Sequence, residues 1–251
     1  MAQQRLDKII ASTGRYSRRE VKTLVREGRV LVDGRIAASA EDKCDPLTAH
    51  ISVNGEELFY REHTYVMLHK PAGVLSATED GRGETVLDLL APEYRKIGLF
   101  PVGRLDKDTE GLLLLTDDGA LAHDLLAPKK HVDKVYFVRT DGALDDADCK
   151  AFEQGITLGD GLECLPAKLE ILKSDAQSEA LITIREGKFH QIKRMLASRG
   201  KPVVYLKRLS MGSLTLDEGL SKGEYRMLTA EEIKNLRESG QFAQGKAGAD
   251  K

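Results

Sequence analysis

The chain has 251 residues, 41% of them apolar, and a formal net charge of −2 at pH 7. These values are ordinary for a globular protein, and the length allows a small domain followed by a larger one. The three cysteines are widely spaced, no apolar run approaches about 18 residues, and the first residues lack the apolar core of a signal peptide. These features argue against a disulfide framework and for a reducing compartment. We expect no membrane span and a cytoplasmic protein that does not contact membranes.

The charge is unevenly distributed along the chain. Residues 1–40 contain nine Lys and Arg against four Asp and Glu, and residues 187–209 contain seven Lys and Arg and no acidic residue. A single basic segment is usually only a solvated face, but two such segments on an otherwise acidic chain suggest two contacts with a polyanion. The charge pattern therefore favours nucleic acid as a partner.

Residues 1–60 predict a small basic domain built from two short helices and two hairpins. Ser17 and Glu20 have the spacing of a capping box, which places the start of the second helix. Asp33-Gly34 and Asn54-Gly55 are typical of hairpin turns. The basic residues of the polar face are candidates for phosphate contacts that supply salt-dependent affinity for RNA: Arg15, Arg18, Arg19, Lys22, Arg26 and Arg29.

A larger α+β domain is predicted over residues 65–238, after a linker at 61–64. The expected strands are 65–69, 112–115, 135–138, 181–185 and 203–206. The expected helices are 86–90, 119–126, 144–157 and 189–197, followed by a last helix that begins at the Thr229–Glu232 capping box. Because hairpins and helices alternate without regular βαβ spacing, we expect a mixed or antiparallel sheet. The tail, 239–251, is expected to be disordered.

The segment Gly103–Gly119, GRLDKDTEGLLLLTDDG, joins a candidate reactive group to a buried strand. Its first turn presents the carboxylate of Asp106, and the apolar run Leu112–Leu115 is typical of a strand buried on both faces. A loop beside a rigid sheet is a common place for a reactive group. The alternative is that Asp106 only forms a hydrogen bond within its own turn, as aspartate often does.

This segment resembles the catalytic motif of the pseudouridine synthases, in the branch that modifies bacterial ribosomal RNA at isolated sites. The resemblance extends from about Arg5 to about Arg237. The basic domain resembles a small ribosomal-protein-type RNA-binding module, the α-L motif, which several RNA-modifying enzymes share. Further matching segments are Lys70-Pro71-Ala72-Gly73, Lys134-Val135-Tyr136 and GKFHQIKRM at 187–195.

The resemblance implies a role for each matching residue. Asp106 is the nucleophile, and Tyr136 stacks on the flipped-out uracil, with a phenol that can take part in proton removal. Lys193 aligns with the basic residue that pairs with the nucleophile. Arg194 is the alternative partner, because adjacent helical positions point about 100° apart and cannot both face the carboxylate equally.

Other residues near these motifs receive smaller roles. Leu206 is implied to line the uracil pocket, and Arg104 to contact an RNA phosphate or steady the turn. We interpret His190 as a structural hydrogen-bonding residue rather than an acid–base group. The implied reaction needs no metal or redox cofactor, and no His or Cys pair has metal-site spacing, so we expect no cofactor.

We therefore predict an enzyme that isomerises one uridine of ribosomal RNA to pseudouridine. Segments 127–138 and 151–171 resemble the small-subunit branch most closely, which favours the small-subunit RNA. A large-subunit synthase is one alternative, and a non-catalytic RNA-binding or ribosome-assembly factor is another. We expect a monomer whose partner is ribosomal RNA, either free or within a pre-ribosomal particle.

Overall fold

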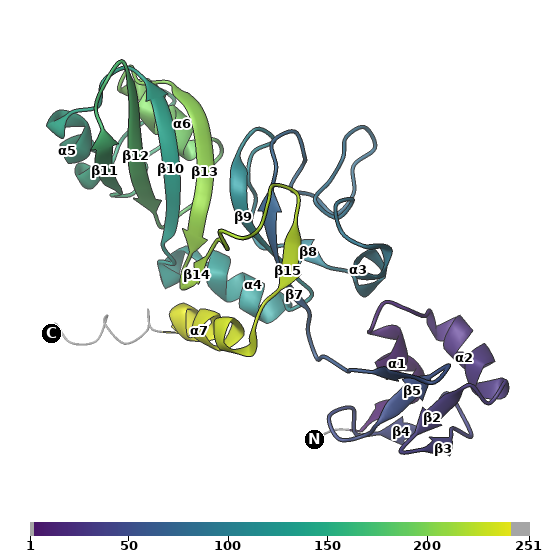
Figure 1. The fold of residues 1–251 in the computed structure, drawn as a ribbon. Helices are drawn as coiled ribbons and strands as arrows, with labels where there is room; N and C mark the ends of the chain where they lie inside the picture. Colours follow the sequence, from purple (N-terminus) through teal and green to yellow (C-terminus); the bar gives the residue numbers. More distant parts are fainter. Residues whose placement is uncertain (1–2, 242–251) are drawn as a thin grey trace, which may run out of the picture. The chain divides into compact units, whose positions relative to one another are not determined.

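A computed structural model of the chain describes residues 3–241. These residues belong to two compact units. Among the described residues, the first unit comprises those up to Thr64 together with Leu90–Leu99, and the second comprises Tyr65–Leu89 together with those from Phe100 onward. Both units combine helices and strands, so the α+β fold predicted from the sequence is confirmed (Figure 1).

The first unit contains two short helices and a small antiparallel sheet, as predicted. Ser17 and Glu20 form the expected capping box at the start of α2, and both expected hairpins are present, with Asp33 and Asn54 at positive φ. The sheet has the order β3-β2-β5-β6, and β1 pairs with β4 separately. The elements are α1 (Leu6–Ala11), α2 (Arg18–Arg26), β1 (Gln4–Arg5), β2 (Val30–Val32), β3 (Arg35–Ile36), β4 (Lys43–Cys44), β5 (Ile51–Val53) and β6 (Glu56–Leu58).

Segment 90–99, with helix α3 (Pro92–Ile97), groups with the first unit, whereas the predicted boundaries assigned it to the larger domain. The reason is a close backbone approach at Gly14, which has a φ of +74°. A Cβ atom there would lie 2.2 Å from the carbonyl oxygen of Glu93. Only glycine permits this approach. The contact could not be predicted from the sequence, because Gly14 and Glu93 are far apart along the chain.

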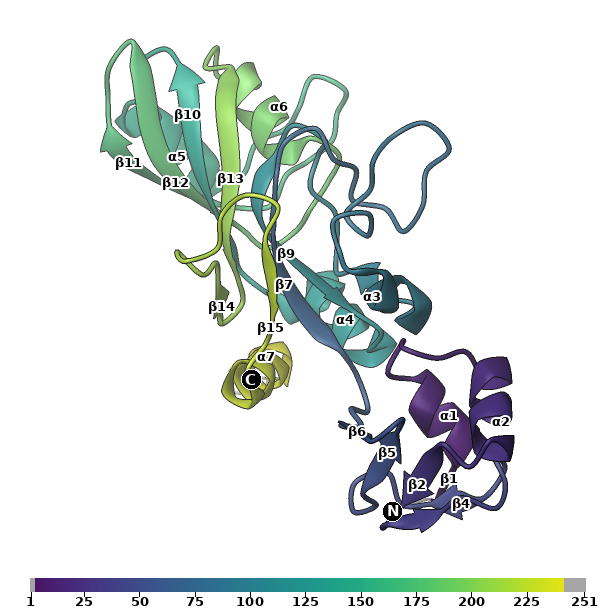
Figure 2. The ribbon, with the colours of Figure 1, turned by 45° about the vertical axis from the view of Figure 1, so that its right-hand side comes forward.

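The second unit is organised by a mixed sheet, as predicted. Within residues 3–241 its main path runs β11-β12-β10-β13-β9-β7-β15, and all of these pairs except β13–β9 are antiparallel (Figures 1 and 2). The short strands β8 and β14 pair with β9 and β13. The strands are β7 (Tyr65–Lys70), β8 (Phe100–Pro101), β9 (Glu110–Thr116), β10 (Lys134–Asp141), β11 (Lys168–Lys173), β12 (Gln177–Ile184), β13 (Val203–Met211), β14 (Leu214–Thr215) and β15 (Tyr225–Met227).

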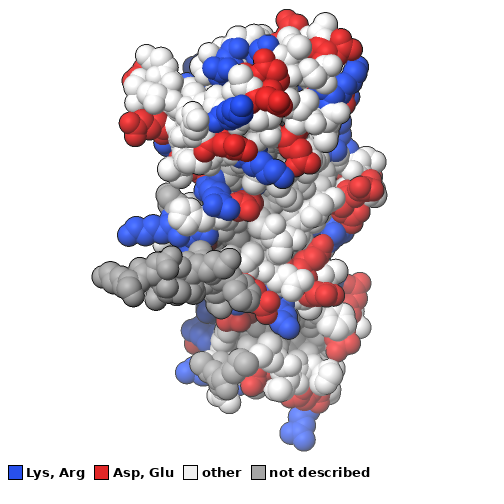
Figure 3. Space-filling view, turned by 90° about the vertical axis from the view of Figure 1, so that its left-hand side faces the viewer, with Lys and Arg blue, Asp and Glu red and all other residues white. Residues whose placement is uncertain are grey.

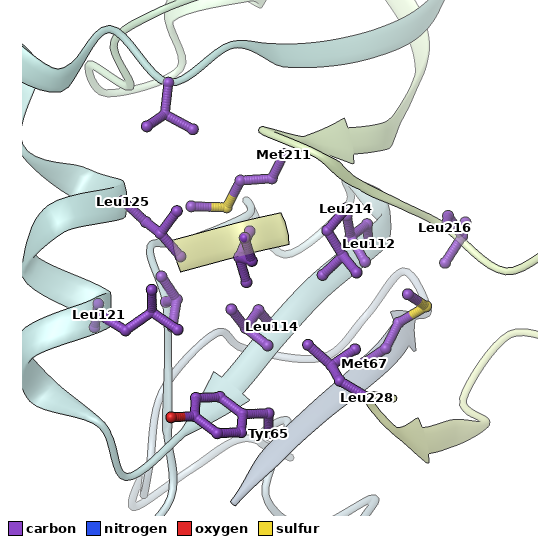
Figure 4. Packing of buried hydrophobic residues seen from close by; sticks show 14 residues of the cluster. Tyr65, Met67, Leu112, Leu114, Leu121, Leu125, Met211, Leu214, Leu216 and Leu228 are labelled. Carbon is purple, nitrogen blue, oxygen red and sulfur yellow. The ribbon is translucent and has the colours of Figure 1, made fainter. Parts of the chain in front are cut away.

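Strand β9 is buried along its whole length, as the leucine run predicted. Leu112 and Leu114 pack into a cluster with Leu121 and Leu125 of α4 (Figure 4). Leu236 of α7 belongs to the same cluster. The helices of this unit are α4 (Gly119–Leu126), α5 (Asp146–Gln154), α6 (Gln191–Ser198) and α7 (Ala230–Gln241), with a 3₁₀ turn at Pro128–Lys130. The core thus fixes the strand that follows the Asp106 turn.

One predicted helix, 86–90, is wrong. Residues 86–89 form turns, and the Thr85 amide and hydroxyl both donate to Asp88 Oδ2 at 2.8 and 2.9 Å. The apolar residues that suggested a helix, Val86, Leu87 and Leu90, are buried by tertiary packing instead. A capping pattern therefore does not ensure a helix when the apolar run that follows is short.

Other differences concern the presence or the extent of elements, and three of them illustrate the causes. Strand β11 was not predicted, because one face of it is exposed and its charged residues weaken the apolar pattern. Strand β13 continues beyond the predicted 203–206 to Met211. Helix α7 extends to Gln241, so 239–241 of the expected disordered tail are helical, and the rest of that tail lies outside the described residues.

Gly111 is the point where the two parts of the sheet meet, and substitution there gives the first testable prediction. Gly111 pairs with Arg208 in the parallel contact between β9 and β13. It has a φ of +106°, and a Cβ would lie 2.2 Å from the Arg208 carbonyl oxygen and 2.7 Å from its amide nitrogen. We expect Gly111→Ala to lower the free energy of unfolding by roughly 3 kcal/mol, because backbone strain adds to a steric clash.

Urea unfolding monitored by circular dichroism measures this effect. The matched control is Gly119→Ala at the start of α4, where an added Cβ meets nothing within 4 Å. This control is expected to change stability by less than about 0.5 kcal/mol. Equal stability of both variants would show that the close approach of β9 and β13 is not required.

Candidate active site

Asp106 lies in a loop whose shape is held by a buried lysine. The side chain of Lys70, at the end of β7, is fully buried. Its Nζ donates to the carbonyl oxygens of Asp106, Lys107 and Thr109 at 3.1, 3.3 and 2.9 Å, and to that of Pro71 at 3.0 Å. The K-P-x-G segment that the resemblance identified therefore fixes the backbone of the Asp106 loop.

Burial of the Lys70 ammonium lowers its pKa to about 8, although the carboxylates of Asp108 and Asp106 oppose the shift. A folded-state pKa below the ordinary value means that keeping the proton costs stability at neutral pH. That cost decreases as the pH rises above about 8 and the group loses its proton. The hydrogen bonds from the Lys70 ammonium to the loop carbonyls oppose this cost.

A second lysine, from α6, contacts the Asp106 carboxylate. Lys193 Nζ lies 3.0 Å from Asp106 Oδ2 and 2.6 Å from Asp108 Oδ1. Although partial burial acts to lower it, the hydrogen bonds to Asp108 and Asp106 raise the pKa of Lys193 above its ordinary value. Lys193 therefore carries its charge at neutral pH and can orient the Asp106 carboxylate.

The structure shows which of two adjacent residues contacts Asp106. The sequence left Lys193 and Arg194 as alternatives, and the contact is made by Lys193. The Arg194 guanidinium pairs with a different carboxylate and lies 2.6 Å from Asp160 Oδ2. Arg194 is absent from the residues that line the cavity at Asp106. The two neighbours leave the helix in different directions, as their spacing requires.

The Asp106 carboxylate opens into a cavity with about 410 Å³ of empty space. Its walls include Tyr136 from β10 and Leu206 from β13, both less than one-tenth exposed. These two residues lie on neighbouring strands, because β10 and β13 are paired. The full lining is Arg104, Leu105, Asp106, Thr109, Tyr136, Ile184, Gly187, Lys188, His190, Gln191, Ile192, Lys193 and Leu206.

Five of the six predicted catalytic or substrate-binding residues thus meet in one cavity, and Arg194 does not. Arg104 is exposed at this cavity and, within residues 3–241, makes no ion pair with a carboxylate. Sequence reasoning missed Ile184 and Gln191, which line the same cavity. The alternation of β12 places Ile184 on the buried face, and this pattern was the available signal.

His190 lies beside Asp106 and does not have the structural role that we expected. Its ring stacks on Phe189, with centroids 3.8 Å apart, and its Nε2 lies 3.6 Å from Asp106 Oδ1. His190 adopts a left-handed backbone conformation at the start of α6. The expected structural hydrogen bond is not present among the described residues, and the ring instead forms part of the cavity wall.

The six basic residues predicted to contact RNA are all exposed in the first unit. Four of them lie near carboxylates: Arg15, Arg18, Lys22 and Arg29. Arg19 and Arg26 on α2 form no ion pair with a carboxylate among residues 3–241. On the molecular face in Figure 3, basic and acidic side chains are interspersed, so an anionic partner would depend on local groups rather than on a uniform field there.

Residues 3–241 contain no group of three or more His, Cys, Asp or Glu side chains that could hold a metal ion. No described helix is long and apolar enough to span a bilayer.

Comparison with known proteins relates this geometry to known families. Residues 64–198 match the family described as RNA pseudouridylate synthase, and residues 4–46 match the S4 domain. A crystal structure of a pseudouridylate synthase superimposes with a TM-score of 0.64 at 38% identity, over 93% of this chain and 99% of that chain.

Several relatives match over nearly their entire length. An uncharacterized RNA pseudouridine synthase of Bacillus subtilis is 51% identical, over 93% of this chain and 98% of the relative. The ribosomal small subunit pseudouridine synthase A of Vibrio cholerae is 40% identical, over 92% and 99%. The ribosomal large subunit pseudouridine synthase B of Bacillus subtilis is 39% identical, over 93% and 96%. The chain that brings Asp106, Tyr136 and Lys193 to one cavity therefore belongs to the RNA pseudouridylate synthase family.

Proposed function

We propose that this enzyme converts one uridine of small-subunit ribosomal RNA to pseudouridine in the cytoplasm. The observation that carries this proposal is the Asp106 carboxylate, 3.0 Å from Lys193 Nζ, in a cavity that also contains Tyr136. A cavity of this kind can receive one base that has left its stack, and it supplies a charged nucleophile beside an aromatic wall.

The reaction breaks the bond between the sugar C1′ and uracil N1 and forms a bond between C1′ and C5. In our proposal Asp106 is the nucleophile that makes this exchange possible, and Lys193 orients its carboxylate through the 3.0 Å contact. Carboxylates perform the comparable task in glycosidases, where the sugar carbon also loses its substituent. The C5 proton leaves when the new bond is complete and N1 gains one, so the reaction is an isomerisation and consumes no cofactor.

The remaining cavity residues position the base. Tyr136 stacks on the uracil, and its phenol takes part in removal of the C5 proton. Leu206 packs against the base from the neighbouring strand. Arg104, exposed at the cavity and without a carboxylate partner in the described structure, contacts a phosphate of the RNA.

The first unit supplies general affinity for RNA in this proposal. The S4 match covers residues 4–46, which include the exposed basic helix α2. Contacts from such side chains to phosphates would orient the RNA without reading its sequence. The protein would act as a monomer, on ribosomal RNA that is free or within a pre-ribosomal particle.

The large-subunit RNA remains the second candidate substrate. The chain is 39% identical to a large-subunit synthase and 40% identical to a small-subunit synthase, so overall identity favours neither. The small-subunit proposal depends on segments 127–138 and 151–171, which resemble that branch. A non-catalytic assembly factor is disfavoured, because such a protein would not need Asp106, Lys193 and Tyr136 in one cavity.

The function is tested by tritium release from RNA that carries tritium at uracil C5. We expect release from small-subunit RNA and none from large-subunit RNA. Asp106→Asn should reduce release by on the order of 10³-fold or more, with unchanged RNA affinity, because an amide cannot act as the nucleophile. The matched control is Asp108→Asn. The native Asp108 also contacts Lys193, but its side chain is exposed.

The control variant should change the rate by less than about tenfold, since Asp108 is not in contact with the cavity's proposed reacting atoms. Full activity of Asp106→Asn would remove the proposed nucleophile. Tritium release from large-subunit RNA alone would contradict the small-subunit assignment and would identify large-subunit RNA as the substrate.

The role of Lys193 gives a separate prediction. Lys193→Met should lower kcat by about 10²-fold with little change in KM, because the cation acts on the nucleophile rather than on general RNA affinity. Arg194→Met removes the neighbouring cation from the same helix and should change kcat by less than about threefold. Single-turnover kinetics measures both variants. A larger loss for Arg194→Met than for Lys193→Met would contradict the assignment.

The proposed docking role of the first unit is tested on α2. Arg19→Gln and Arg26→Gln remove cations that have no carboxylate partner in the described structure. Each should weaken binding and reduce the slope of log K against log salt by about 0.7–0.9. Arg35→Gln, on β3, is the control and should leave the slope unchanged. Equal slopes for all variants would show that α2 does not contact the RNA phosphates.

A further inference from the structure

The strands that carry the active-site residues also form a groove on their opposite face. Side chains alternate along a strand, so Tyr136 and Leu206 face the cavity while their neighbours Phe137 and Tyr205 face the other way. These neighbours line a second, open groove with about 720 Å³ of empty space. Its lining is Phe137, Arg139, Tyr205, Lys207, Leu209 and Lys222. In Figure 1 this face of β10 and β13 is turned toward the viewer, with α6 behind the strands.

The groove presents positive charge without a carboxylate among its lining residues. Arg139, Lys207 and Lys222 provide three cations. Two of these cations already have a carboxylate partner, because Glu179 pairs with Arg139 at 2.8 Å and Glu110 pairs with Lys222 at 2.8 Å, and these ion pairs offset part of the charge.

Lys207 differs from the other two cations of the groove. In the part of the chain that the structure describes, it makes no ion pair. Its backbone is fixed by the pairing of β13 with β10 and β9. A half-buried lysine with a fixed backbone and no carboxylate partner is suited to bind an external anion.

Two aromatic rings lie among these cations. Phe137 and Tyr205 pack edge to face, with centroids 6.1 Å apart. The Arg139 guanidinium lies 5.6 and 5.5 Å from the two ring centroids. The Tyr205 hydroxyl donates to Glu110 at 2.7 Å, which fixes the orientation of its ring. The groove therefore combines rigid aromatic surface with cations at short range.

We propose that this groove binds an unpaired stretch of the substrate RNA, away from the target uridine. Phosphates would contact Lys207, Arg139 and Lys222, and a base would pack on Phe137 or Tyr205. Aromatic rings interleaved with cations are typical of surfaces that bind single-stranded nucleic acid, since every base has a face that can stack. An acidic protein segment would use the cations but has no comparable use for the rings.

This inference rests on the proposed function, because it assigns a second contact to the same RNA. The active-site cavity would hold the flipped uridine, while the groove would hold flanking sequence on the other face of the same two strands. A minimal hairpin would occupy the cavity alone, whereas a longer RNA would occupy both. The two contacts can therefore be measured separately.

The test compares two RNAs with a common hairpin that contains the target uridine. One is the hairpin alone, and the other carries single-stranded extensions at both ends. We expect the extensions to strengthen binding to the wild-type protein by about tenfold or more, a typical gain for stacking of one or two bases. The double variant Lys207→Gln/Arg139→Gln should lose most of this gain. Its salt slope on the extended RNA should fall by about 0.7 through the loss of Lys207, and by a smaller amount through the loss of Arg139, which is already paired with Glu179.

Binding of the hairpin alone and tritium release from it should be unchanged in this variant. Lys168→Gln is the matched control, because Lys168 lies on β11 of the same sheet, is exposed and does not line the groove. A 4-thiouridine placed in the extension should crosslink to Phe137 or Tyr205 in the wild-type protein. This crosslink provides a readout that does not depend on the stability of the variant.

Two outcomes would overturn the inference. The first is equal affinity of the wild-type protein for both RNAs. The second is that the double variant still binds the extended RNA more tightly than the hairpin, to the same degree as the wild-type protein, and that no crosslink forms in the groove. Failure of the proposed function would give a different result. The wild-type protein would then release no tritium from either RNA, whatever the length dependence of binding.

Discussion

The buried ammonium group of Lys70 is the contact on which the active-site geometry depends. Its bonds to the carbonyl oxygens of Asp106, Lys107 and Thr109 replace the hydrogen bonds to water that this loop would otherwise need. A buried cation is costly unless such acceptors surround it, and the lowered pKa of Lys70, about 8, reflects that cost. The loop is therefore held in one shape, and Asp106 projects into the cavity from a fixed backbone.

The same pair of strands serves two surfaces of different character. One face of β10 and β13 is closed over the cavity by α6, and its side chains are largely buried. The opposite face is only partly covered and presents cations and aromatic rings. The close approach at Gly111 joins this pair to β9 and so connects the cavity walls to the strand that follows Asp106. A change at that glycine would alter the Asp106 loop and both surfaces together.

Much of the fold could be predicted because local signals agreed with tertiary packing. The leucine run of β9, the capping boxes at Ser17 and Thr229, and the hairpin turns act over a few residues. Helix 86–90 failed because Thr85 and Asp88 close a turn instead. Strand β11 was missed because an edge strand with one exposed face carries a weak apolar pattern.

The sequence by itself identified the candidate site residues, because Asp106, Tyr136, Lys193 and Leu206 each lie in a short segment that resembles a motif of the family. It could not choose between Lys193 and Arg194, because a helix turns by about 100° per residue and its rotation is set by packing. Tertiary structure made that choice by burying Ile192 and Met195, which directs Lys193 to Asp106 and Arg194 to Asp160. It also decided the positions of Lys70 and the groove at Lys207, because both depend on strands that are distant in sequence and meet only in the folded sheet.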